Sequence, residues 1–200
     1  MEIQRATFGP FATNCYLVWQ DPAQALLIDA GYMPAAIGAK AKALGLTVRS
    51  ILITHGHGDH MLGAEDLRTQ FQTDLYYPEA DLAFATGDFL GEPYPIPKPS
   101  HLLHGGEKLE LGGFEIDVLA VPGHTPGHVA FRIGDDLFAG DCLFYDSIGR
   151  TDLPGGDAET LYRSLAGLLR LPDDVRVHPG HGPDTTVGRE RWENPFLAGI

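Results

Sequence analysis

Apolar and β-branched residues recur along the chain in short runs, and glycine, proline and aspartate separate these runs. Runs of this length, bounded by such turn residues, are typical of β-strands. The pattern predicts strands over residues 3–8, 15–19, 25–29, 49–54, 75–77, 108–111, 114–121, 129–133, 137–139 and 175–178.

Helical patterns lie between these runs. Leu161, Leu165 and Leu168 fall on one stripe of residues 157–169, which predicts an amphipathic helix there. We expect further helices over residues 33–44, 62–71 and 80–86, and a short closing segment after residue 189. The order is β-rich, helix, strand, helix, and then the same again. It predicts an α/β protein whose two sheets face each other, with the helices outside.

Residues 87–106 follow neither pattern. Glycines and prolines recur throughout this stretch, so we expect it to exclude regular structure. A loop of this length in a compact domain is usually functional or mobile. The chain shows no repeat and no break in composition, so we expect residues 1–200 to form a single domain.

Composition and charge narrow the classes of partner. The 200 residues, 44% of them hydrophobic, are enough to bury one substantial core. The net charge of −13 argues against a nucleic-acid partner. We expect no membrane span, because no apolar run reaches about 18 residues. The N-terminus lacks a signal-peptide layout, so Cys15 and Cys142 are expected to stay reduced in a cytoplasmic protein.

The strongest chemical signal is the segment THGHGDH at residues 54–60, where a predicted buried strand ends. Imidazole and carboxylate groups are preferred ligands of zinc and similar cations. His55 and His57 are two positions apart and point to the same side of an extended chain. Gly58 can redirect the chain, so that Asp59 and His60 face a different direction. This arrangement favours a metal site over a solvated histidine-rich turn, and it suits two adjacent metal ions better than one.

Three more segments place candidate ligands after predicted strands. They read VPGHTPGH at residues 121–128, FAGDC at 138–142 and VHPGHG at 177–182. A glycine directly precedes His124, Asp141 and His181 and leaves room for the close approach of a metal. Each segment alone is weak evidence, because a histidine near a turn is more often a surface or hydrogen-bonded residue.

The four motifs, in this order and spacing, resemble the metallo-β-lactamase superfamily and, within it, the glyoxalase II branch of hydroxyacylglutathione hydrolases. The resemblance implies a four-layer αββα sandwich with a two-metal site at one edge. By this resemblance, the first ion is bound by His55, His57 and His124. The second ion is bound by Asp59, His60 and His181, and Asp141 bridges both ions. Zinc is the favoured ion, with iron and manganese as alternatives.

The same resemblance implies a metal-dependent hydrolase that acts on a small-molecule thioester such as an S-acylglutathione. Two ions about 3.5–4 Å apart lower the pKa of a water between them towards about 7, and the resulting bridging hydroxide would attack the carbonyl carbon. Asp59 is the candidate catalytic residue that orients this nucleophile. Arg150 occupies the place of a basic residue that binds the glutathione carboxylate. An ion pair of Arg150 with Asp152 or Asp157 is an equally weighted interpretation.

Other activities of the same fold stay open. A persulfide dioxygenase would hold one iron through equivalents of His55, His124 and Asp141, but the segment PGHG at residues 179–182 favours the hydrolases. A lactamase, a nuclease and a non-catalytic metal-binding module are less well supported. We expect no C-terminal helical domain of the glyoxalase II type, because few residues follow His181.

Some neighbouring residues have two interpretations. Cys142 adjoins Asp141, but neighbours on a strand point to opposite faces, so we expect its side chain in the core. His128 is expected either to orient a ligand or to have a structural role at a strand end. No pattern supports metal binding by His101, His104 or His178.

Overall fold

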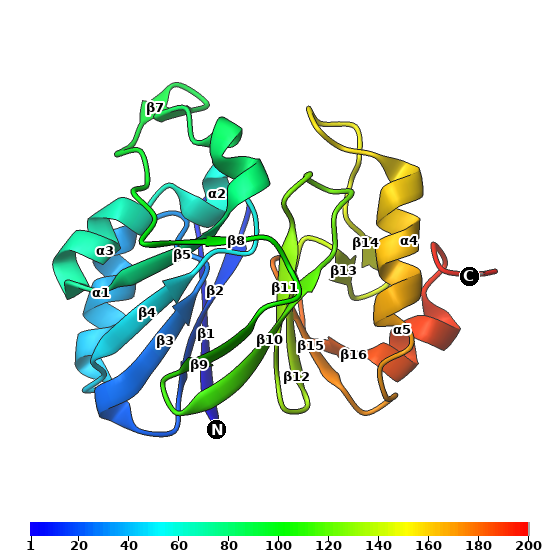
Figure 1. The fold of residues 1–200 in the computed structure, drawn as a ribbon, viewed down its shortest axis with the longest axis horizontal. Coiled ribbons are helices and arrows are strands. Elements are labelled where there is room, and N and C mark those ends of the chain that lie inside the picture. The colour runs from blue at the N-terminus through cyan, green and yellow to red at the C-terminus, as the bar shows by residue number, and fades with distance from the viewer. Residues whose placement is uncertain (200) are drawn as a thin grey trace.

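Two six-stranded sheets pack face to face, and helices cover the outer face of each (Figure 1). This computed structural model describes residues 1–199. The first sheet has the order β1-β2-β3-β4-β5-β8. Its strands are β1 (Glu2–Phe8), β2 (Thr13–Trp19), β3 (Ala25–Ile28), β4 (Val48–Leu52), β5 (Asp74–Pro78) and β8 (His101–Leu103). The four layers confirm the predicted αββα sandwich.

The second sheet has the order β16-β15-β12-β11-β10-β9. Its strands are β9 (Lys108–Leu111), β10 (Phe114–Ala120), β11 (Val129–Ile133), β12 (Asp136–Gly140), β15 (Arg176–Pro179) and β16 (Thr185–Thr186). Two small hairpins lie outside both sheets, one formed by β6 (Asp88–Phe89) and β7 (Glu92–Pro93), the other by β13 (Leu143–Phe144) and β14 (Ser147–Ile148).

Helices α1 (Pro34–Ala43) and α3 (Ala64–Phe71) flank the first sheet, and α4 (Ala158–Leu168) and α5 (Val187–Glu193) flank the second (Figure 1). Shorter helices are η1 (Pro22–Gln24), α2 (Gly58–Met61) and η2 (Glu79–Phe84). In the part of the chain that the structure describes, no helix has the length and apolar character needed to cross a bilayer.

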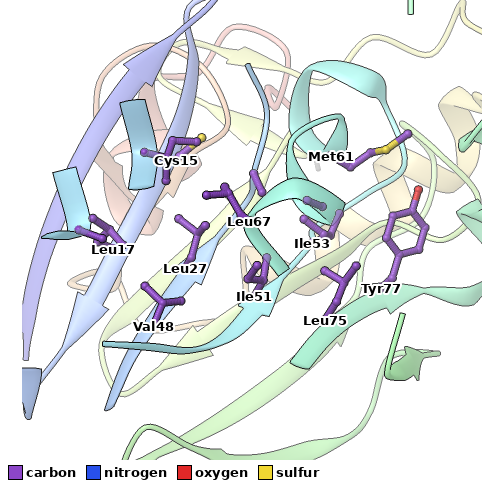
Figure 2. Packing of buried hydrophobic residues seen from close by; sticks show 14 of the residues in the cluster. Cys15, Leu17, Leu27, Val48, Ile51, Ile53, Met61, Leu67, Leu75 and Tyr77 are labelled. Carbon is purple, nitrogen blue, oxygen red and sulfur yellow. The ribbon is translucent and has the colours of Figure 1, made fainter. Parts of the chain in front are cut away.

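The strand period of two separates the core into layers. On β2, Cys15 and Leu17 face the helices α1 and α3, whereas Tyr16 and Val18 face the second sheet. Figure 2 shows the outer layer, where Leu27 and Ile51 of the sheet lie near Leu67 of α3. A third layer of buried apolar residues joins the second sheet to α4 and α5. Each sheet is thus buried on both faces, which makes it a rigid platform for residues at its strand ends.

The expectation that residues 87–106 exclude regular structure was wrong. They contain the β6–β7 hairpin and the edge strand β8. Strand β8 pairs in parallel with β5. Its residues follow the last proline of the stretch, Pro99, so they carry the backbone N–H groups that this pairing needs. The helix expected over residues 80–86 is the 3₁₀ helix η2. The short helix α2, which was not predicted, begins within the THGHGDH segment.

Phe131 tests the packing between the two sheets, because its ring is fully buried in the inner layer. We expect Phe131→Ala to lower the free energy of unfolding by about 3–5 kcal/mol in urea denaturation, since it removes a large buried side chain and leaves a cavity. Leu102→Ala, at a residue that is 41% exposed, should change it by no more than about 0.5 kcal/mol. Equal losses in the two variants would contradict this account of the core.

Candidate metal centre

All seven predicted ligand residues lie at one end of the two sheets, where strands terminate. Strands β3, β4 and β5 run parallel, as do β12 and β15, so their carboxyl ends meet at the same edge. His55 follows β4, and Asp141 follows β12 directly. His124 follows β10, and His181 comes just after β15. The segments are far apart in sequence, and the register of the strands brings them together.

The first set of candidate ligands consists of three histidines. His55, His57 and His124 each offer a nitrogen, and these nitrogens lie within 4.8 Å of one another. His57 Nδ1 and His124 Nε2 are only 2.9 Å apart, so the two rings converge on one point. His55 Nε2 is buried and has no hydrogen-bond partner. Buried polar atoms are nearly always satisfied, so this nitrogen fits a metal ion.

The second set combines one carboxylate with two imidazoles. His181 Nε2 lies 3.3 Å from His60 Nε2 and 3.3 Å from Asp59 Oδ2. Ligand atoms of all three residues fall within 4.8 Å of one another. Nitrogen and carboxylate donors in this arrangement suit zinc, iron or manganese.

Asp141 lies between the two sets. Its Oδ1 is 3.3 Å from His60 Nε2, and its Oδ2 is 3.6 Å from His124 Nε2. Oδ1 is buried without a hydrogen-bond partner. Gly180 lies against this carboxylate and against His60, so a side chain at position 180 would collide with both residues. The seven residues therefore form one continuous cradle of candidate ligand atoms, in which Asp141 joins the two sets.

One buried carboxylate orients histidines of both sets. His60 Nδ1–H donates to Asp29 Oδ2 over 2.8 Å. The Thr54 hydroxyl donates to the same carboxylate and therefore accepts from His55 Nδ1–H over 3.0 Å. In both rings Nε2 is left as the atom that faces the centre. Our sequence reasoning missed Asp29 as a site residue, although an acidic residue directly after the apolar run ALLI was a usable signal.

The remaining candidate ligands have their own partners. His124 Nδ1–H donates to the Arg150 carbonyl over 2.7 Å, and His181 Nδ1–H donates to the Phe11 carbonyl over 2.9 Å. The Thr13 hydroxyl donates to Asp59 Oδ2 over 2.9 Å. His128 Nε2 accepts from the Asp141 amide over 3.1 Å, so His128 positions the segment that carries Asp141. Thr13, like Asp29, was not predicted.

Asp81 ties the two histidine-bearing turns together. Its carboxylate is fully buried and accepts from the Gly56 amide, the Thr125 hydroxyl and the Gly127 amide. Burial raises the pKa of this carboxyl, although the three hydrogen bonds lower it in part. Nothing in the local sequence of η2 predicts this role, because both partner turns are distant along the chain.

The pKa values of three imidazoles in the cradle are shifted in opposite directions. Burial and the neighbouring His124 lower the pKa of His57 to about 4. Burial also acts to lower the pKa of His181, but hydrogen bonds to Asp141 and Asp59 outweigh it and raise this pKa to about 10. Burial also acts to lower the pKa of His60, but the negative charges of Asp141, Asp59 and Asp29 outweigh it and raise this pKa well above its usual value. The carboxylates thus hold positive charge at this point, and a bound dication would displace the protons.

Other residues considered from sequence lie outside the cradle. Cys142 is fully buried in the apolar layer beneath α4, as expected, and burial raises the pKa of its thiol. Both cysteines are free thiols. His178 pairs with Asp136, while His101 and His104 lie near exposed carboxylates.

A cavity of about 580 Å³ opens onto the centre. It is lined by five of the candidate ligands, one arginine and six apolar side chains. These are His57, Asp59, His124, Asp141, His181, Arg150, Phe11, Phe89, Leu90, Phe144, Ile148 and Leu153. Arg150 lies at the rim with 61% of its side chain exposed, and its guanidinium forms two 2.7 Å hydrogen bonds with Asp152. The structure therefore shows the ion pair with Asp152 and also places Arg150 within reach of a ligand.

Comparison with known proteins shows similarity to one superfamily over most of the chain. The family model described as the metallo-beta-lactamase superfamily matches residues 8–181. The chain is 37% identical over 98% of its length to "Hydroxyacylglutathione hydrolase GloC" of Haemophilus influenzae, and the match covers 98% of that protein.

Solved structures agree over nearly the whole chain. The BLEG-1 B3 metallo-beta-lactamase superposes with a TM-score of 0.93 at 36% identity, covering 99% of this chain and all of that one. TTHA1623 in a di-iron-bound form gives 0.89 at 42% identity, with coverage of 97% and 100%. ETHE1 from Myxococcus xanthus gives 0.84 at 30% identity, with coverage of 100% and 85%.

The role of Asp29 can be tested by its amide variant. Asp29→Asn replaces one of the two accepting carboxylate oxygens by an NH₂ group, which cannot accept a hydrogen bond, so His60 or Thr54 loses part of its orientation. We expect zinc affinity, measured by competition with a chromophoric chelator, to fall about 10- to 100-fold. Asp135→Asn, on an exposed turn, is the matched control and should leave the affinity unchanged. Wild-type affinity in Asp29→Asn would show that this carboxylate does not orient the ligands.

Proposed function

Because the chain belongs to the metallo-β-lactamase superfamily and is a metal-dependent hydrolase of that superfamily, we propose that it hydrolyses small-molecule thioesters at a two-metal site, with zinc as the favoured ion. The observation that carries this proposal is the position of Asp141 between two complete sets of ligands. The similarity to a protein named as a hydroxyacylglutathione hydrolase supports the choice of a thioester.

The residues divide into two binding sets and a bridge. His55, His57 and His124 would hold one ion, and Asp59, His60 and His181 the other. Asp141 would bind both. Divalent ions at such a site supply Lewis acidity and a nucleophilic water of lowered pKa. Asp59 also lines the cavity, so its carboxylate can accept a hydrogen bond from water and orient it towards a bound carbonyl carbon.

Arg150 is proposed to bind a carboxylate of the thiol part of the substrate. Its present partner, Asp152, is 67% exposed in its side chain. Exposed ion pairs contribute little to stability, so a substrate carboxylate can compete with Asp152 for the guanidinium. The planar guanidinium would then bind the new carboxylate through the same pair of donors.

A one-iron persulfide dioxygenase is the second candidate. It is supported by the similarity to ETHE1 and by the proximity of His55, His124 and Asp141, the three residues that such an enzyme would use. The compact second set, Asp59, His60 and His181, favours the hydrolase, because a single iron would leave these ligands unused.

The free thiols of Cys15 and Cys142 support the cytoplasmic location that we propose.

Metal content and activity test the two-metal proposal together. We expect purified protein to hold about two divalent ions per chain by elemental analysis and to hydrolyse S-lactoylglutathione or another thioester. Removal of the metal with a chelator should abolish hydrolysis, and zinc should restore it. Asp141→Ala should lower kcat at least about a hundredfold, since it removes a shared ligand, whereas Asp135→Asn should match the wild type.

One tightly bound iron per chain, with oxygen uptake on glutathione persulfide and no thioester hydrolysis, would overturn the hydrolase proposal and favour the second candidate.

Arg150→Ala separates substrate binding from the reaction. We expect KM to rise about tenfold for thioesters whose thiol carries a carboxylate, because a charged hydrogen-bonded pair is lost, and kcat to stay close to the wild type. Thioesters of an uncharged thiol should show no change. Asp152→Asn is the complementary variant, because it frees the guanidinium and should lower the same KM. An unchanged KM in Arg150→Ala would remove this residue from the substrate site.

A further inference from the structure

Leu90 lies in a conformation that its side chain disfavours. The β6–β7 hairpin has a two-residue turn, Leu90-Gly91, and both residues have positive φ, 56° and 83°. Such turns favour asparagine or aspartate followed by glycine, because a leucine side chain is strained in the left-handed region. Leu90 is also 72% exposed. Neither backbone preference nor burial explains a leucine here, so its apolar side chain needs another reason.

The hairpin is anchored at its base and carries Leu90 at its tip. Tyr94 is buried in the outer core beside the first sheet, and its amide donates to the Gly87 carbonyl over 2.9 Å. Phe89 packs against Gly58, where any side chain would collide with its ring. The hairpin projects beyond the first sheet at the end where α2 lies (Figure 1). Leu90 is therefore held at the cavity that opens onto the candidate metal centre while remaining open to solvent.

Leu90 extends an apolar surface that faces the cavity. Phe11, Phe89 and Leu90 all line it, and the rings of Phe11 and Phe89 are 6.1 Å apart. The ring of Tyr32 packs near both phenylalanines, with its centroid 6.4 Å from that of Phe11 and 6.2 Å from that of Phe89. We call Phe11, Phe89 and Leu90 the apolar wall. Because the Phe11 carbonyl accepts from His181, this wall is attached to the second set of ligands.

The only arginine or lysine among the residues that line the cavity, Arg150, is attached to the first set. Arg150 bonds His124 through its carbonyl, and its guanidinium lies at the rim. A thioester has two substituents, one on the carbonyl carbon and one on sulfur. If the carbonyl carbon lies at the centre and a carboxylate of the thiol reaches Arg150, the acyl substituent extends towards the apolar wall. That wall offers no charged or hydrogen-bonding side chain to a polar acyl group.

We propose that the apolar wall is an acyl-binding subsite, that Leu90 determines specificity within it, and that the chain prefers thioesters whose acyl group is an unbranched hydrocarbon chain of several carbons. This inference rests on the proposed thioester hydrolysis. Each methylene removed from water contributes about a fourfold preference. The strained, exposed Leu90 would become buried against the substrate.

A chain-length series on one thiol tests the proposal with the metal-loaded protein. Acetyl-, butyryl- and hexanoylglutathione differ in apolar length and not in charge. We expect kcat/KM to rise at least about tenfold from acetyl to hexanoyl in the wild type. Leu90→Asn should lower the hexanoyl value about fivefold or more and change the acetyl value less than about twofold. Its unfolding temperature should be equal or higher, because asparagine tolerates positive φ.

Met33 provides a matched control. It is also exposed, at 57%, and has a φ of 59°, but it does not line the cavity. Met33→Asn relieves the same kind of strain and should leave the chain-length preference unchanged. Equal kcat/KM for acetyl and hexanoyl substrates in the wild type would overturn the proposal. An equal loss for all three substrates in Leu90→Asn would also overturn it.

Failure of the proposed reaction would be recognised separately. If no thioester is hydrolysed, calorimetric binding of acetate, butyrate and hexanoate to the metal-loaded protein still measures the subsite. Affinity that rises with chain length in the wild type, and not in Leu90→Asn, would support an acyl-binding wall even though the reaction is different. Affinity that is independent of chain length would overturn it.

Discussion

The Asp29 carboxylate accepts hydrogen bonds from the Thr54 amide, the Thr54 hydroxyl and the His60 imidazole, and it does so in a fully buried position where β3 and β4 end side by side. A buried carboxylate is costly unless its oxygens are satisfied, so this network constrains everything attached to it. It sets which nitrogen of His55 and of His60 faces the centre. Through these two residues it connects the orientation of both ligand sets to the register of the first sheet.

The second sheet is joined to this network through Asp141 and Asp81. Asp141 follows β12 and lies close to imidazoles of both sets. Asp81 holds the turn that carries His57 against the turn that carries His124. The two sheets share an apolar core, which fixes their separation, and these two carboxylates fix the polar edge. Apolar packing alone is not directional, so the hydrogen bonds decide how the ligands meet.

The floor and the walls of the cavity have different origins. The floor consists of residues at the ends of sheet strands, which are held by two buried faces. The walls come from the β1–β2 turn with Phe11, the β6–β7 hairpin, the β13–β14 hairpin and the segment around Arg150, which lie outside the sheets. Solved structures of differently named relatives share the sandwich with TM-scores of 0.84 to 0.93. A shared floor supplies the reaction chemistry, whereas the walls distinguish one substrate from another.

The sequence by itself determined the fold class and the identity of the residues that gather at the site. Short apolar runs, helical stripes and the THGHGDH segment are local patterns, and local spacing dictates which face of a strand or helix a residue occupies. It did not identify Asp29, Asp81 or Thr13, because their partners lie 25 to 46 positions away in the chain. It also did not reveal the hairpin within residues 87–106, and it left open whether Arg150 pairs with Asp152, pairs with Asp157 or binds a substrate carboxylate. Only the tertiary structure decided these features, since strand register and sheet packing determine which distant groups become neighbours, and hydrogen bonds between buried groups depend on that placement.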